Sequence, residues 1–200
     1  MSPHQFQLIG GDPLLDFVNT VHDWTAPEAR DYVPTFAEVL RFAEVAGVIS
    51  AAEAKRLASA STGAELRRLR ELRARLERIL RALVAGRAPA LGDLDSLARD
   101  GAEAARGSRW WSEKGRLMRG IDPGETGAAT VRLRLIEAAV ALLTSDRVAR
   151  MSACPSCGWF FLDTTKNKSR RWCSMAMCGN PAKARAYYRR RRPGSRPHSR

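Results

Sequence analysis

Four cysteines close to the C-terminal end are the residues whose type and spacing most clearly predict chemistry. Cys154 and Cys157 are separated by two residues, fifteen residues lie between Cys157 and Cys173, and four lie between Cys173 and Cys178. Two close cysteine pairs joined by a short loop are typical of a tetrahedral Zn²⁺ site. Two disulfide bonds are the alternative, but the chain opens MSPHQFQ, which lacks the basic and apolar stretches of a secretion signal, so we expect a cytoplasmic protein with reduced cysteines. The pattern therefore predicts one zinc ion held by all four thiolates.

This zinc ion is expected to be structural. A catalytic zinc keeps one coordination position open, whereas four cysteines occupy every position of a tetrahedral ion. The chain has only three histidines and lacks a Ser-His-acid set, a glycine-rich phosphate loop and a His-Glu zinc motif. We therefore expect no enzyme activity, and we expect the metal to supply folding free energy to a unit too small for its own core.

The residues around the cysteines predict a hairpin and then a helix. Trp159 to Leu162 is typical of a short strand, residues 163–169 are rich in turn formers, and residues 170–172 lead back to the third cysteine, so the two halves are expected to form a hairpin over the metal. Asn180-Pro181 combines a favoured N-cap with a favoured first helical residue, which predicts a helix to about Arg192. Hairpin, cysteines and helix follow in the order of a treble-clef zinc finger.

Both ends of the chain also resemble one known family. The run CPSCGWFFLDTTKNKSRRWCSMAMCGNPAKARAYYRR is similar to the CGNR zinc finger, whose motif begins at the last cysteine and is Cys178-Gly179-Asn180 here. Pro181 stands where that family usually has arginine. The run GGDPLLDFVNTVHDW, Gly10 to Trp24, is similar to the opening motif of the ABATE domain, a mainly helical domain that precedes the finger in that family. The resemblance implies a stress-induced transcription regulator.

Positive charge is concentrated at the C-terminal end. Residues 163–200 hold twelve Lys or Arg and one acid, whereas the other 162 residues hold twenty-two bases and twenty acids. Such a local field attracts polyanions, of which nucleic acid is the usual one, although an acidic protein or an anionic membrane surface would be attracted too.

Charge and family resemblance together favour DNA as the partner, with RNA or an acidic protein partner as the alternative. The candidate phosphate contacts lie at the expected hairpin tip and on the expected helix: Lys166, Lys168, Arg170, Arg171, Lys183, Arg185, Arg189 and Arg190. The basic tail, residues 193–200, fits either a contact or a flexible solvated end. On this hypothesis the helical part acts as a sensor or as a dimerisation module of a homodimer.

A second candidate site lies near the N-terminus. Asp12-Pro13 predicts the start of a helix that runs to about His22. Asp16, Asn19 and Thr20 lie off its apolar face and are candidates to line a pocket for a small-molecule effector. Asn, Asp and Thr more often make local hydrogen bonds, so both interpretations stay open.

The rest of the chain predicts a mainly α fold. Apolar periodicity, capping residues and glycines indicate helices over residues 35–45, 51–60, 64–85, 91–106 and 127–145. Residues 108–127 are expected to form a short hairpin or a loop whose paired tryptophans are buried. We predict a helical domain over residues 1–146, a small treble-clef-like finger of hairpin plus helix over 147–192, and the basic tail. The link between the first two is so short that the finger should dock on the helical part.

Overall fold

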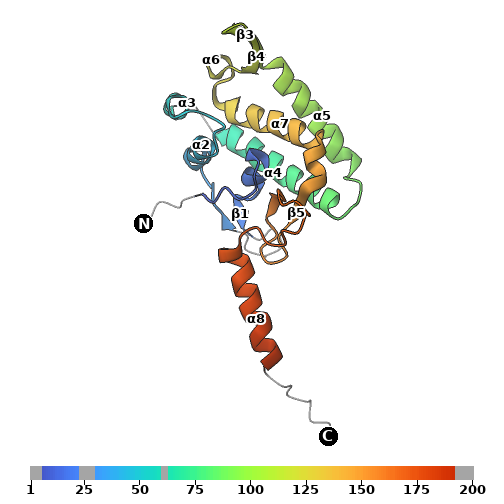
Figure 1. Cartoon of the computed structure of the whole chain (residues 1–200). Helices are drawn as coiled ribbons and strands as arrows, with labels where there is room; N and C mark the ends of the chain where they lie inside the picture. The colour runs from blue at the N-terminus through green and yellow to red at the C-terminus, as the bar shows by residue number, and fades with distance from the viewer. Residues whose placement is uncertain (1–5, 23–29, 60–62, 192–200) are drawn as a thin grey trace.

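A helical body carries a small cysteine-containing unit, and the last helix projects from that unit away from the body (Figure 1). The structure is a computed structural model that describes residues 6–22, 30–59 and 63–191. Its helices are α1 (Pro13–Val18), α2 (Phe36–Val45), α3 (Ala51–Leu57), α4 (Gly63–Val84), α5 (Leu91–Arg106), α6 (Pro123–Thr126), α7 (Thr130–Leu143) and α8 (Asn180–Arg191), with short helical turns η1 (Gly127–Ala129), η2 (Asp146–Arg150) and η3 (Met175–Gly179). Three antiparallel pairs complete the fold: β1 (Val21–His22) with β2 (Arg30–Asp31), β3 (Ser108–Glu113) with β4 (Arg116–Ile121), and β5 (Met151–Ala153) with β6 (Phe160–Leu162). The predicted basic tail, residues 193–200, lies outside the described residues.

Helix α1 lies at the centre of the body. Its residues Leu14, Leu15, Phe17 and Val18 are all buried, and it packs against α4, α7 and β6. A helix buried on every side is typical of a core helix rather than of a surface helix. Asp12 caps its first turn by accepting a hydrogen bond from the Leu14 N–H at 3.1 Å.

The sequence placed the end of this first helix incorrectly. The helix ends at Val18, not near His22, and residues Val21 and His22 pair with β2 instead. Tyr32 N–H donates to the Thr20 carbonyl at 2.8 Å, so the chain after α1 belongs to a small strand pair. Periodicity alone could not detect this, because the strand partner comes from a later part of the sequence.

The other predicted helices are confirmed with small changes of length. Ser50 and Glu53 form a capping box at the start of α3, and Gly47 has a φ of +69° just after α2. Helix α4 packs its leucines inward, and Glu77 pairs with Arg81 at 2.8 Å as expected for residues four apart. Arg75, by contrast, pairs with Asp100 of α5.

Residues 108–121 form a hairpin, which is one of the two structures expected for this segment; the other was a loop. Lys114 and Gly115 both have positive φ at its two-residue turn, as a tight hairpin turn requires. The expected burial of its tryptophans is wrong, since Trp110 is 64% exposed and Trp111 is 46% exposed. The hairpin stands at the end of α5, and only Ile121 at the end of β4 reaches the core.

The cysteine-containing unit docks on α1. Asn19 donates its side-chain N–H to the Phe160 carbonyl and accepts the Phe160 N–H, both at 2.8 Å. Leu162 N–H donates to the Gly10 carbonyl at 2.8 Å. Phe160 and Leu162 are members of the main core, so the finger shares the hydrophobic core of the helical body. The expectation of a docked finger is confirmed.

Helix α4 adds a second contact to the finger. The Arg81 guanidinium lies 4.6 Å from the centre of the Phe160 ring and donates to the Gly158 carbonyl at 3.3 Å. The Trp159 indole N–H donates to the Val21 carbonyl at 2.9 Å on the other side. Among the described residues, no helix is both long and apolar enough to cross a membrane.

Candidate metal centre and basic surface

The four cysteines lie together at one point of the finger. Their Sγ atoms are all within 4.8 Å of one another, with Cys157 and Cys173 at 3.5 Å and Cys173 and Cys178 at 3.6 Å. Thiolates bound at about 2.3 Å to a tetrahedral zinc ion lie about 3.8 Å apart, so these separations fit one zinc ion. None of the four thiols is in a disulfide bond. The predicted ligand set, Cys154, Cys157, Cys173 and Cys178, forms one closed site that fits a single Zn²⁺.

The first cysteine pair sits in a turn between β5 and β6. Cys154 N–H donates to the Trp159 carbonyl at 2.8 Å, and Gly158 N–H donates to the Cys154 carbonyl at 2.9 Å. Gly158 has a φ of +73°, a conformation that residues with a Cβ rarely adopt. The glycine after Cys157 therefore lets the chain turn back sharply and present both sulfurs to the same point.

The second pair is held by the turn η3 before the last helix. Ser174 accepts the Met177 N–H, and the Ser174 carbonyl accepts the Cys178 and Gly179 N–H groups at 3.0 Å. Ser174, not the expected Asn180, therefore caps this helical segment, because η3 continues directly into α8. A Cβ on Gly179 would lie 2.5 Å from the Met175 sulfur, so a larger residue there would displace the Met175 side chain.

The thiols of Cys154, Cys173 and Cys178 are buried, and that of Cys157 is half-buried, where its hydrogen bond with Cys173 lowers its pKa to about 5. Burial raises the pKa of the Cys178 thiol to about 11. The neighbouring Cys157 sulfur raises the pKa of the Cys173 thiol as well. Four thiolates in this space need a divalent cation, which is the chemistry that zinc supplies when it is bound.

The hairpin beside the metal is formed differently from the expectation. Strand β6 pairs with β5, which precedes the first cysteine, rather than with residues 170–172. Residues 163–169 form a turn held by the Asp163 carboxylate, which accepts hydrogen bonds from the Thr165 and Arg170 N–H groups at 2.8 and 2.7 Å. The expected basic hairpin tip is therefore an exposed turn between β6 and the third cysteine.

Arg170 holds this turn against the body. Its guanidinium lies 4.4 Å from the centre of the Phe161 ring and donates to the carbonyls of Leu162 and Ile9, each at 3.3 Å, and to that of Cys173. Most of its hydrogen-bonding capacity is used inside the protein.

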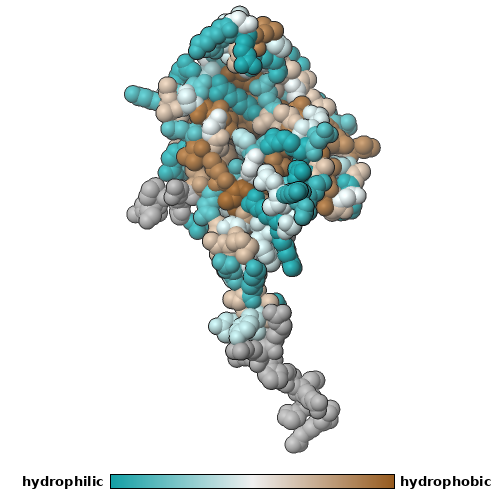
Figure 2. Space-filling model, in the orientation of Figure 1, coloured by the Kyte–Doolittle hydropathy of each residue, from teal (hydrophilic) through white to brown (hydrophobic). Residues whose placement is uncertain are grey.

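The other predicted basic residues whose side chains the structure describes are exposed. Arg171 and Lys183 line a groove of about 530 Å³ together with Trp172 and Ser169. Lys168 lies at the turn, where its amino group donates to the Ala149 carbonyl at 3.3 Å. The remaining exposed members of the set are Lys166, Arg185 and Arg189, while the side chain of Arg190 lies outside the part of the chain that the structure describes. Figure 2 shows α8 standing clear of the body.

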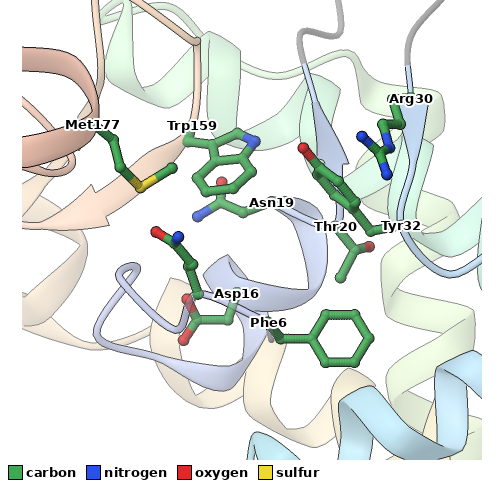
Figure 3. A pocket seen from close by; sticks show the side chains of 9 residues that line it. Phe6, Asp16, Asn19, Thr20, Arg30, Tyr32, Trp159 and Met177 are labelled. Carbon is green, nitrogen blue, oxygen red and sulfur yellow. The ribbon is translucent and has the colours of Figure 1, made fainter. Parts of the chain in front are cut away.

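The three residues predicted for a pocket do line one cavity. Asp16, Asn19 and Thr20 face a cavity of about 240 Å³, and Trp159 and Met177 of the finger form part of its wall (Figure 3). The alternative expectation of local hydrogen bonds holds for Asp16, which accepts the Gly10 N–H, and for Thr20, whereas Asn19 bonds to a residue 141 positions away. Asn19 binds the Phe160 backbone, and Thr20 donates to the Phe17 carbonyl at 2.6 Å and accepts from Arg73 at 2.7 Å.

The fold and the site together define a class of protein, a helical domain docked on a closed four-cysteine zinc finger. A family model described as "Putative stress-induced transcription regulator" (ABATE) matches residues 11–146, and the CGNR zinc finger model matches residues 150–191. The chain belongs to this ABATE family, because the first match covers more than half of it. No curated protein matches the sequence.

Proposed function

We propose that this protein is a DNA-binding transcription regulator whose finger contacts phosphates through Arg171 and α8. The observation that carries the proposal is the charge of α8. Lys183, Arg185 and Arg189 are exposed on this helix, and residues 180–191 include no acid. Among the described side chains, none of the three forms an ion pair. A helix that carries charge of one sign on an extended, unpacked segment matches a polyanion.

The stability of α8 supports the same proposal. Its described side chains pack on little beyond the neighbouring turn η3. An isolated helix of twelve residues is marginal in water, and like charges along it add repulsion. Phosphates would remove that repulsion, so binding and helix stability would reinforce each other.

Arg170 and Arg171 take different roles in this proposal. Arg170 shapes the finger because it binds backbone carbonyls, whereas Arg171 is exposed beside Trp172, with its guanidinium 5.0 Å from the indole centre. Lys183 lies on the same groove from α8. We propose that Arg171 and Lys183 contact one stretch of phosphate backbone, and Lys166 and Lys168 extend that surface along the turn.

The helical domain is the sensor module in this proposal. The cavity beside α1 favours a sensor role over a dimerisation role, because the same cavity is walled by residues of the finger. The closed metal site gives zinc no open position for a substrate, so the proposal includes no catalytic step.

A salt titration tests the DNA contact. The measurement is the affinity of the zinc-loaded chain for duplex DNA over a range of salt, for the parent and for the Arg185→Ala/Arg189→Ala double variant. The slope of log affinity against log salt should flatten by about one for each lost phosphate contact. Arg56→Ala removes an exposed charge from α3 on the body and serves as the control.

The outcome decides between partners. An unchanged slope for the double variant, or an equal change for Arg56→Ala, would move the contact surface away from α8. The same titration with single-stranded RNA and heparin ranks the polyanions. If the affinity for duplex DNA is no higher than that for heparin and shows no sequence preference, the regulator proposal is wrong. If the chain binds RNA more tightly than DNA, RNA is the partner.

A further inference from the structure

The cavity at the junction of the helical body and the finger has walls from four separate segments. We call it the junction cavity; it is lined by Asp16 of α1, Arg30 and Tyr32 of the β2 segment, Phe6 of the N-terminal segment, and Trp159 and Met177 of the finger. In Figure 3, Trp159 and Met177 close one side, and Asp16 and Phe6 lie opposite them. Its volume of about 240 Å³ is below the usual range of pockets for drug-sized ligands, so it suits a smaller molecule.

Asp16 is the polar group of this cavity whose charge lacks a partner. Its side chain is buried, and it accepts the Gly10 N–H at 2.8 Å. Among the described residues, no basic side chain forms an ion pair with it, whereas the neighbouring Asp12 pairs with Arg147 at 2.9 Å. A buried carboxylate without a cation is costly, because desolvation penalises its charged form. The neighbouring backbone N–H groups occupy only part of the acceptor positions on its two oxygens.

The apolar walls of the cavity are aromatic and held in place. The Trp159 indole is fixed by its hydrogen bond to the Val21 carbonyl, and the Tyr32 ring meets it edge to face, with ring centres 6.3 Å apart. Aromatic faces attract organic cations as well as apolar groups. A cation near Asp16 would thus gain both an ion pair and contacts with the rings.

From this arrangement we propose that the junction cavity binds a small primary amine with a compact apolar body, whose ammonium group pairs with Asp16. The apolar body packs between Phe6, Tyr32 and Trp159. Arg30 stacks on Tyr32, with its guanidinium 5.1 Å from the ring centre, on the side formed by β2. Since Arg30 carries a positive charge, an anionic ligand could be attracted there, and the experiment must separate the two cases.

The site would link the ligand to the finger, because Trp159 follows the first cysteine pair and Met177 precedes Cys178. A ligand that binds only the docked arrangement stabilises it by mass action. Regulation of DNA binding by this ligand rests on the proposed function. Binding of the ligand to the cavity does not, so ligand binding is measured without DNA.

Three probes with the same ring and different end groups test the proposal: 2-phenylethylamine, 2-phenylethanol and 3-phenylpropionate. Binding to the zinc-loaded full chain is measured by calorimetry and by the shift in Tm. We expect the amine to bind at least about tenfold more tightly than the alcohol and to raise the Tm by about 3–6 °C at ten times its Kd. 3-Phenylpropionate should not bind.

Asp16→Asn is the decisive variant, since an amide oxygen can still accept the Gly10 N–H while the charge is lost. It should bind the amine no better than the alcohol. Asp95→Asn, which removes an exposed carboxylate of α5, is the matched control and should keep the preference. Equal binding of amine and alcohol by the parent, tighter binding of 3-phenylpropionate, or an unchanged amine affinity in Asp16→Asn would each overturn the proposal.

Discussion

Asp16 shows how a single buried residue carries an energetic cost that its hydrogen bonding relieves only in part. Burial raises its pKa from 3.8 to about 6, and the nearby Asp12 raises it further while the Gly10 N–H opposes the shift. An acid whose folded pKa is raised destabilises the fold when it ionises. That cost is absent below the unfolded pKa near 4 and is complete above about pH 6.

Asp16→Asn should therefore stabilise the ligand-free protein at pH 7 but not at pH 4. A rise of about two pKa units corresponds to at most about 3 kcal/mol, and loss of the stronger hydrogen bond from Gly10 reduces this to about 1–2 kcal/mol. The measurement is the free energy of unfolding of parent and variant between pH 4 and pH 8. If the difference in unfolding free energy between variant and parent does not grow between pH 4 and pH 7, burial does not penalise the charged form of Asp16.

Arginines illustrate what the sequence could and could not predict at the residue scale. The four zinc ligands were predictable because cysteine spacing alone specifies them. Arg73, Arg132 and Arg170 look like the exposed arginines around them in sequence, yet Arg73 pairs with Asp31 at 2.6 Å and Arg132 with Glu65 at 2.5 Å inside the protein. Asp31 and Glu65 are far from these two arginines in the chain, and Arg170 binds backbone carbonyls, so no local pattern could separate a structural arginine from a phosphate-binding one.

At the scale of elements, helices were easier to predict than strands. The capping box at Ser50 and the leucine periodicity of α4 act within one segment, and the structure has both helices close to the expected bounds. Strand β6 pairs with β5 and also binds Gly10, so its place depends on residues before the first cysteine and near the N-terminus. The sequence predicted the strand but assigned its partner wrongly for that reason.

Asn19 is expected to control the docking of β6 on α1. Asn19→Ala would leave the N–H and carbonyl of Phe160 buried and unpaired, at a cost of about 2–4 kcal/mol. Urea unfolding of the zinc-loaded protein measures this loss, and zinc transfer to a chelator should become faster because the finger loses part of its support. Asn167→Ala, in the exposed turn, is the control. Equal stabilities of the two variants would show that the paired hydrogen bonds do not hold the finger.

At the scale of the whole molecule, stability and charge are divided between two regions. The core runs without a break from α1, α4 and α7 into β6, so body and finger share one hydrophobic unit. Helix α8 lies outside that unit (Figure 1). The proposed DNA contact is thus placed on an element outside the shared core.

Hydrogen exchange should show this division directly. In the free protein, amides of α8 are expected to exchange far faster than those of α4, because opening α8 exposes little buried surface. Saturating duplex DNA should slow exchange in α8 by about tenfold or more and leave α4 unchanged, since phosphate contacts stabilise only the helix that makes them. A chain that ends at Gly179 keeps all four cysteines and should retain zinc and the exchange pattern of α4, while losing most of its affinity for duplex DNA. If duplex DNA binds the full chain tightly and α8 still exchanges as fast as in the free protein, the polyanion contact lies on another surface.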